Sequence, residues 1–152
     1  MNSHPKVSLR SVTHENFYNV IGLMVKPEQR TFVAPNAKSI AEAHYNDNVY
    51  FKAIYADETP VGFIMLAHQG TIGGLTRYYL WRLMVDQNHQ GQGYGKLALD
   101  LLCEYVRTRP NADFLYGSYH PGEHGPEKFY HHYGFEDIDE MEENEQVMRI
   151  KL

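Results

Sequence analysis

The chain has 152 residues, of which 43% are hydrophobic and 22% are charged, and its formal net charge is -5. This length suits a single domain over residues 1–152 with a buried core, and the acidic balance argues against nucleic acid as a partner, because a phosphate backbone binds basic surfaces. The one cysteine excludes an intrachain disulfide. We expect no signal peptide and no membrane span, and hence a cytoplasmic protein.

The sequence pattern of the N-terminal third predicts one strand and two helices. Residues 7–11 form the strand, and Thr13 is expected to cap a helix that ends before Pro27. The apolar face of that helix comprises Phe17, Val20, Ile21 and Met24. Asn36 is expected to cap a second helix that runs to Tyr45.

Three strands follow, at residues 49–56, 61–68 and 78–85. The turn residues of 57–60 and 71–74 separate them. Because these connections are short, we expect the three strands to form an antiparallel meander.

The sequence pattern of the C-terminal half predicts helices over 93–107 and 127–133, and Gly134 is expected to end the second one. Cys103 is interpreted as a small buried residue of the first helix. The residues expected to face the sheet are Leu97, Leu101, Leu102 and Tyr105. A strand at 114–118 is expected to lie parallel to 78–85, because a helix crosses between them. With final strands at 135–138 and 147–152, the expected fold is mixed α/β, with helices on both faces of a sheet.

In the segment that connects the strand at 78–85 to the following helix, glycine occupies every second position, at Gly91, Gly93 and Gly95. Converging backbone N–H groups and a helix N-terminus there favour a bound phosphate or pyrophosphate. The spacing fits neither the G-x-G-x-x-G dinucleotide fingerprint nor a P-loop, in which Ser or Thr would follow Lys96. A glycine-rich turn without a ligand is the alternative, although three alternating glycines weaken the local chain.

The pattern Gln90-x-x-Gly93-x-Gly95 after an apolar strand resembles the acyl-CoA-binding motif of the GNAT superfamily of N-acetyltransferases. Residues 129–135, Phe-Tyr-His-His-Tyr-Gly-Phe, are similar to the C-terminal signature of that superfamily. Segments 27–29, 32–36, 60–63, 80–86 and 121–126 further resemble bacterial members described as diamine or spermine/spermidine acetyltransferases. Two positions depart from the superfamily pattern: Glu123 replaces a common Asn, and Pro126 replaces a common Ala.

The resemblance implies the GNAT fold, with a mostly antiparallel, twisted sheet that is splayed at the cofactor site. It implies direct transfer of an acetyl group from acetyl-CoA, as co-substrate, to a primary amine of a polyamine or diamine, and a homodimer as the expected assembly. The residues expected to bind the cofactor are Leu83, Met84, Val85, Gln90, Gly91, Gln92, Gly93, Tyr94, Gly95 and Lys96. Tyr130 is the expected general acid for the departing thiolate, or else a core aromatic.

The acceptor amine must lose a proton before it attacks, and Glu28, Glu42 and Glu123 are the candidate bases. For each of them, a solvated surface carboxylate is favoured over a role as base. Tyr79, Trp81 and Phe32 could line the acceptor pocket or pack in the core.

Two further groups of polar residues are interpreted as structural. The acidic residues Asp137, Asp139, Glu140, Glu142, Glu143 and Glu145 could attract a polycation, but a solvated hairpin turn is the favoured interpretation. No metal is expected at His120, His124, His131 and His132, because their spacing is unsuitable and no cysteine supports them.

Two other functions stay open from the sequence. One is acetylation of another amine, such as an amino acid, an aminoglycoside or a protein N-terminus. The other is a non-catalytic acyl-CoA-binding sensor domain, against which the presence of Tyr130 argues.

Overall fold

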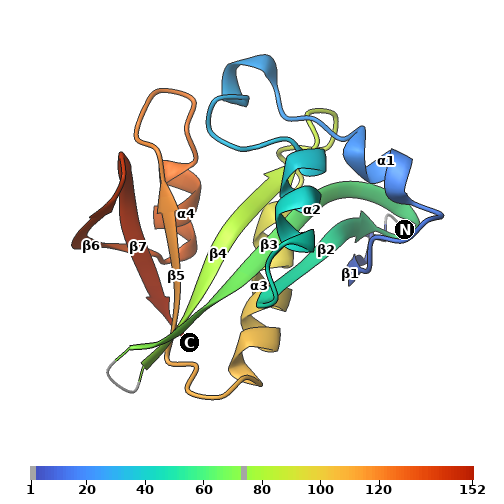
Figure 1. Cartoon of the computed structure of the whole chain (residues 1–152). Helices are drawn as coiled ribbons and strands as arrows, with labels where there is room; N and C mark the ends of the chain where they lie inside the picture. Colours follow the sequence, from blue (N-terminus) through green and yellow to red (C-terminus); the bar gives the residue numbers. More distant parts are fainter. Residues whose placement is uncertain (1–2, 73–74) are drawn as a thin grey trace.

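Seven strands form one sheet in the order β1-β2-β3-β4-β5-β7-β6 (Figure 1). The structure, a computed structural model, describes residues 3–72 and 75–152. The strands are β1 (Val7–Arg10), β2 (Val49–Ala56), β3 (Thr59–Ile72), β4 (Leu75–Val85), β5 (Phe114–Tyr119), β6 (Glu136–Glu142) and β7 (Glu145–Lys151). Only β4 and β5 pair in parallel; every other pair is antiparallel. This confirms the predicted mixed, mostly antiparallel sheet.

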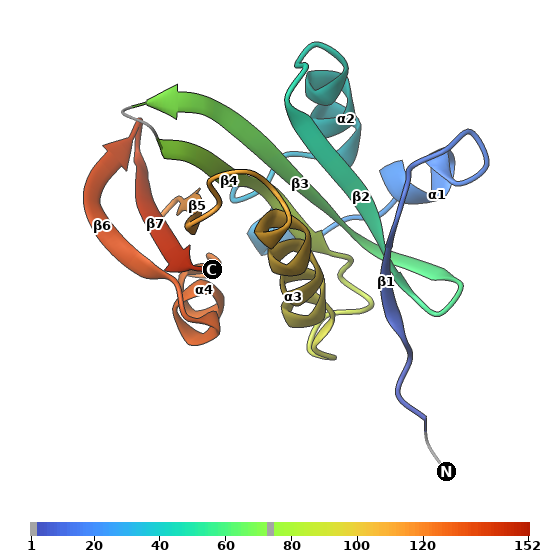
Figure 2. The same cartoon turned by 90° about the horizontal axis from the view of Figure 1, so that it is seen from below.

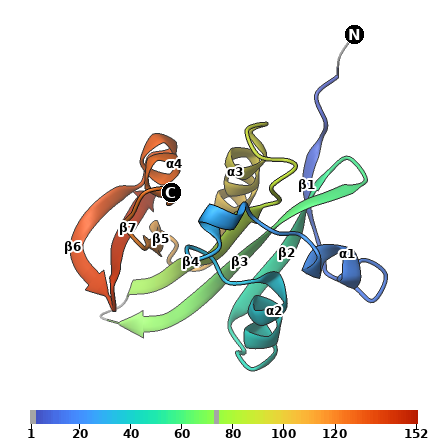
Figure 3. The same cartoon turned by 90° about the horizontal axis from the view of Figure 1, so that it is seen from above.

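Helices cover both faces of this sheet, as predicted (Figures 2 and 3). The helical segments are α1 (Phe17–Ile21), the 3-10 turn η1 (Pro27–Gln29), α2 (Asn36–His44), α3 (Tyr94–Arg107) and α4 (Glu127–Tyr133). One apolar cluster joins α3 and α4 to the sheet, and a second joins α1 and α2 to the opposite face. Within the described parts of the chain, no helix combines the length and hydrophobicity needed to cross a bilayer.

The strands β4 and β5 stay together over only three residue pairs. Tyr78 to Leu80 of β4 pair with Leu115 to Gly117 of β5, and beyond this point the two strands diverge (Figure 1). The helix α3 connects the two strands along the chain, and a crossover connection of this kind is what a parallel pair requires. The predicted splay of the sheet is therefore present, and it lies where the glycine loop begins.

The buried face of α3 is rotated relative to the prediction. Its buried residues are Tyr94, Ala98, Leu99, Leu102, Cys103 and Val106. Leu97 is 41% exposed, and Tyr105 is half-buried because it stacks on Tyr50. Of the four residues expected to face the sheet, only Leu102 is fully buried, because the spacing of the leucines fits two neighbouring faces and the packing of the sheet selects one. Cys103 is buried, as predicted.

The start of each N-terminal helix differs from the prediction. The residue that precedes α1 is Asn16, not Thr13, and Asn16 accepts a hydrogen bond from the backbone of Thr13. Asn36 lies inside α2 and donates its side-chain amide to the backbone of Val20, 2.9 Å away. A buried tertiary hydrogen bond thus uses the side chain that was expected to cap the helix.

The strands also extend further than predicted. β3 and β4 reach Ile72 and Leu75, so the expected turn at 71–74 is shorter, and its two glycines, 73 and 74, lie outside the described residues. β6 and β7 pair up to Glu142 and Glu145, so residues expected in an acidic loop belong to strands.

Packing of α3 predicts a contrast between two leucines of that helix. Leu102→Ala should lower the free energy of unfolding by about 2–5 kcal/mol, because it leaves a cavity in a fully buried region. Leu97→Ala, on the exposed side of the same helix, should cost much less. Urea denaturation of both variants measures the difference, and equal losses would contradict the observed orientation of α3.

Candidate active site

A cavity of about 1110 Å³ opens where β4 and β5 diverge. Residues 80–85 of β4 line it on one side, and Ser118 and Tyr119 of β5 line it on the other. The glycine loop and the start of α3 form one end, and Phe129 and Tyr130 of α4 lie beside it. The split in the sheet therefore brings together both sequence motifs, which are far apart along the chain.

The β5-facing edge of β4 has no strand partner beyond Leu80. Pairing with β5 stops there, while pairing with β3 continues along the other edge to Val85. The register between β3 and β4 shifts at Trp81, so that this strand carries one extra residue at the fork. Leu83, Met84 and Val85 line the cavity, and the free edge beside them is suited to pair with an extended ligand as an added strand does.

The glycine loop adopts a backbone that ordinary residues avoid. Gly91 and Gly93 have φ of 76° and 84°, which L-residues with a Cβ adopt only at a cost. A Cβ at either glycine would meet no protein atom within 4 Å. Backbone conformation, and open space for a ligand, are thus the reasons for glycine here. The side chain of Gln90 fixes the loop by donating to the backbone oxygen of Val85, 2.9 Å away.

The N-terminus of α3 presents unsatisfied backbone donors to the cavity. Gly93 precedes the helix, and no side chain that the structure describes caps it. The N–H groups of the first turn, at Tyr94, Gly95 and Lys96, therefore lack an intrahelical partner, which makes this end suitable for an anion. The Lys96 ammonium lies 3.1 Å from Asp100, so part of its charge is already balanced.

Most of the predicted cofactor residues are found together on this wall. All of the ten expected residues except Gln92 line the cavity. The side chain of Gln92 accepts a hydrogen bond from the Tyr94 hydroxyl, 3.1 Å away. The backbone N–H of Gln92 was expected to bind a pyrophosphate, and this contact stays a prediction.

Tyr130 is 7% exposed and lines the same cavity. Its ring packs against Phe129 and Phe135, so the core interpretation of this residue is also partly correct. Its hydroxyl forms no hydrogen bond with any described residue. Burial, and to a smaller extent the charge of Glu145, raise the pKa of Tyr130, so the hydroxyl keeps its proton at neutral pH.

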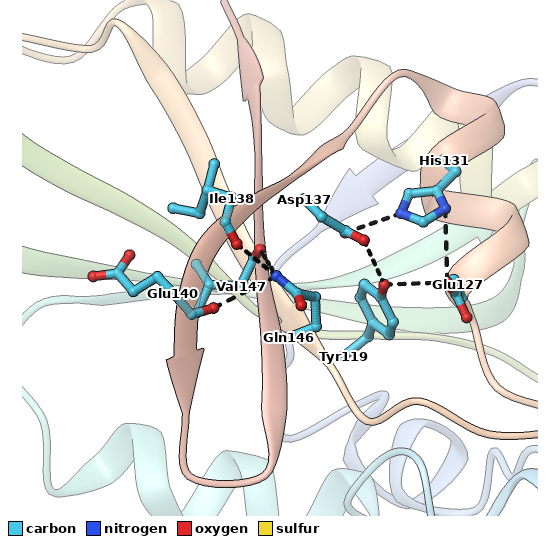
Figure 4. A network of polar contacts seen from close by, with 8 residues as sticks. All are labelled: Tyr119, Glu127, His131, Asp137, Ile138, Glu140, Gln146 and Val147. Carbon is cyan, nitrogen blue, oxygen red and sulfur yellow. Dashed lines mark hydrogen bonds and ion pairs between the residues drawn. The ribbon is translucent and has the colours of Figure 1, made fainter.

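A polar network holds α4, and with it Tyr130, against the sheet (Figure 4). The Tyr119 hydroxyl donates to Asp137, 2.9 Å away, and lies 3.3 Å from Glu127. His131 lies between the same two carboxylates, with Nε2 2.9 Å from Asp137 and Nδ1 4.0 Å from Glu127. These contacts join α4 to both β5 and β6.

This network also brings together three possible metal ligands. One ligand atom each of Glu127, His131 and Asp137 lie within 4.8 Å of one another, a convergence that the sequence did not indicate. However, each imidazole nitrogen faces a different carboxylate, whereas a shared ion needs one nitrogen and both carboxylates directed at one point. The geometry is that of a link between α4 and β6, and the absence of a metal stays a prediction.

The three carboxylates expected as candidate bases do not line the cavity. Glu28 is exposed on η1, and the side chain of Glu123 is 90% exposed. Glu42 of α2 forms an ion pair with Arg82, at 3.2 Å. Tyr79, Trp81 and Phe32 do line the cavity, as the acceptor-pocket prediction requires.

Other carboxylates occupy the wall instead. Asp47, Glu142 and Glu145 line the cavity. Glu142 accepts a hydrogen bond from the Tyr79 hydroxyl at 2.7 Å, and Glu145 accepts one from Ser118 at 3.3 Å. From the sequence, these two glutamates belong to the acidic cluster that could attract a polycation, for which a solvated turn is the favoured interpretation. Which of its residues face the cavity depends on the β6–β7 register, which composition does not reveal.

Comparisons with known proteins agree with this geometry. The family model described as "Acetyltransferase (GNAT) family" matches residues 20–135. A spermine/spermidine N(1)-acetyltransferase of Bacillus subtilis is 23% identical, over 95% of this chain and 97% of the relative. Among solved structures, Arabidopsis thaliana Naa50 in complex with the bisubstrate analogue CoA-Ac-MVNAL has a TM-score of 0.69 and 23% identity, over 96% of this chain and 99% of that one. The PaiA N-acetyltransferase of Thermoplasma acidophilum in complex with coenzyme A has a TM-score of 0.66 and 19% identity, over 97% and 99%.

The backbone of the glycine loop predicts different effects for two substitutions at Gly93. Gly93→Ala should weaken the affinity for coenzyme A about tenfold, because alanine at positive φ costs roughly 1–2 kcal/mol. Gly93→Asn also adds a Cβ, but asparagine tolerates this conformation, so it should retain more affinity than alanine. Titration calorimetry measures both, and an alanine variant that binds as tightly as the wild type would contradict the assignment of the loop.

Proposed function

Because this chain belongs to the acetyltransferase (GNAT) family, we propose that it transfers the acetyl group of acetyl-CoA directly to a primary amine of a polyamine or diamine. The observation that carries this proposal is the position of Tyr130. Its buried hydroxyl has no hydrogen-bond partner among the described residues, and it shares one cavity with the N-terminus of α3 and the β5-facing edge of β4.

The cavity offers acetyl-CoA two kinds of backbone contact. The N–H groups at the start of α3 are suited to its pyrophosphate. The free edge of β4, at Leu83, Met84 and Val85, is suited to its extended pantetheine arm. An unpaired N–H of this edge could also polarise the thioester carbonyl. Both contacts direct the thioester towards α4, which carries Tyr130.

In the reaction, the amine nitrogen forms a bond to the acetyl carbon, and the carbon–sulfur bond of the thioester breaks. Tyr130 donates its proton to the departing sulfur, which becomes the thiol of coenzyme A. The attacking amine must be neutral, and an alkylamine has a pKa of about 10.4, so lowering it to near neutrality costs about 4 kcal/mol. A base or a chain of water molecules in the cavity can instead remove this proton after binding.

Two observations support a cationic acceptor. Three carboxylates, Asp47, Glu142 and Glu145, line the same cavity as Tyr130. The relative from Bacillus subtilis is named for its action on spermine and spermidine. A peptide N-terminus is the second candidate, because the similar structure from Arabidopsis thaliana contains a bisubstrate analogue of a peptide.

A panel of amines tests the proposed substrate class. Release of free thiol from acetyl-CoA should have its highest kcat/KM with spermine, spermidine or a short diamine. The panel includes a peptide with the sequence MVNAL, a free amino acid and an aminoglycoside. Turnover of the peptide alone would overturn the polyamine assignment, and binding of acetyl-CoA without turnover of any amine would favour a sensor.

Removal of the Tyr130 hydroxyl tests the catalytic step. Tyr130→Phe should lower kcat about 10²-fold near neutral pH, because general acid catalysis of this kind is lost, while affinity for coenzyme A stays unchanged. Since the pKa of Tyr130 is raised, ionisation of this residue should not reduce the wild-type rate between pH 7 and 9.

The matched control is Tyr133→Phe on the same helix. This variant removes a hydroxyl that bonds to Asp100, 2.8 Å away, outside the cavity. It should affect stability more than kcat. If both variants keep the wild-type kcat at every pH, the general-acid role of Tyr130 is wrong.

A further inference from the structure

Glu142 and Glu145 face each other across the turn between β6 and β7, where they are direct cross-strand partners. We refer to them as the acidic pair. Both line the cavity that contains Tyr130. Like charges in directly opposed positions destabilise a β-ladder, so this arrangement disfavours the empty site.

Each carboxylate of the acidic pair is held by one hydroxyl at the fork of the sheet. The Tyr79 hydroxyl of β4 donates to Oε2 of Glu142 at 2.7 Å, and Ser118 Oγ of β5 donates to Oε2 of Glu145 at 3.3 Å. Burial raises the pKa of Tyr79, so this residue stays a donor at neutral pH. In both glutamates, Oε1 receives no hydrogen bond from the described residues and is available for a ligand.

Neighbouring carboxylates of the same hairpin have basic partners. Arg77 lies 2.9 Å from Glu140, and His131 lies 2.9 Å from Asp137. The acidic pair has no such partner among residues 3–68 and 77–152, whose side chains the structure describes. Its two negative charges are therefore balanced by no side chain of the described chain, which leaves this part of the cavity complementary to a cation.

Tyr130 connects the acidic pair with the reaction centre. It is 7% exposed, and its hydroxyl has no partner within the described part of the protein. Tyr130, Glu142 and Glu145 all line the same cavity. One bound molecule that has two amines can therefore contact the acidic pair with one amine and present the other beside Tyr130.

We propose that the acidic pair binds the non-reacting ammonium group of a diamine or polyamine while the other amine of the same molecule is acetylated beside Tyr130. This inference rests on the proposed function. Only the attacking nitrogen must be neutral, and the second amine stays protonated, because its pKa is about 10.4. Two carboxylates are suited to that permanent cation, whereas a proton acceptor for the attacking amine would require only one.

The test compares 1,4-diaminobutane with pentylamine, in which a methyl group replaces the second ammonium. The wild type should prefer the diamine in kcat/KM. Glu142→Gln and Glu145→Gln should each reduce this preference about tenfold or more, mainly through KM, because each removes a charge-assisted contact. The control is Glu143→Gln, which makes the same charge change in the turn between the pair, at an exposed residue that does not line the cavity; it should keep the preference.

Other results would overturn the inference. An unchanged preference in both variants would show that the acidic pair does not bind the second ammonium, although the proposed function would stand. Equal losses of kcat with both amines would indicate a role in proton removal or in structure instead.

A binding measurement separates this inference from the proposed function. Calorimetry with 1,4-diaminobutane on the protein saturated with coenzyme A needs no turnover. If the wild type acetylates no amine but binds the diamine, and the two variants lose this binding, the proposed function fails and the cation site stands. If the wild type does not bind the diamine, the cation site is wrong.

Discussion

The short pairing between β4 and β5 is the constraint on which the rest of the site depends. Two parallel strands that share only three residue pairs leave one backbone edge of β4 unpaired in the interior of a sheet. Unpaired backbone groups are costly where water is excluded, so such an edge is stable only if it faces a cavity that solvent or a ligand can fill. The cavity at the fork is thus a consequence of the strand pairing, and the side chains around it decide which ligand it suits.

The other elements of the site are held at this fork by packing from one side and polar contacts from the other. α3 is anchored by a buried apolar face, which fixes its N-terminus against the glycine loop. α4 is short, and the contacts of Tyr119, His131 and Asp137 join it to the neighbouring strands (Figure 4). A buried tyrosine is thereby held beside a cavity without any hydrogen bond of its own to the described residues.

The cavity wall has two kinds of polar group. The helix N-terminus and the free edge of β4 provide backbone N–H groups, which suit an anionic, extended co-substrate. Carboxylates from the α2–β2 connection and from the β6–β7 hairpin line the same cavity. This combination is consistent with a reaction between an anionic thioester and a cationic amine.

The sequence by itself determined the succession of strands and helices along the chain and located the two motifs, because hydrophobic periodicity, glycine spacing and the motifs are local properties of the chain. It did not determine which carboxylates reach the cavity. Glu28, Glu42 and Glu123 lie outside the cavity wall, whereas Glu142 and Glu145 reach it through the register of a hairpin that follows the last motif. The buried face of α3 and the role of Asn36 were likewise decided by tertiary contacts, since several faces and several hydrogen-bond partners are compatible with the same local pattern. Residue types and their spacing thus predict which chemistry the chain can perform, but only the packing of distant strands decides which charged side chains surround the substrate.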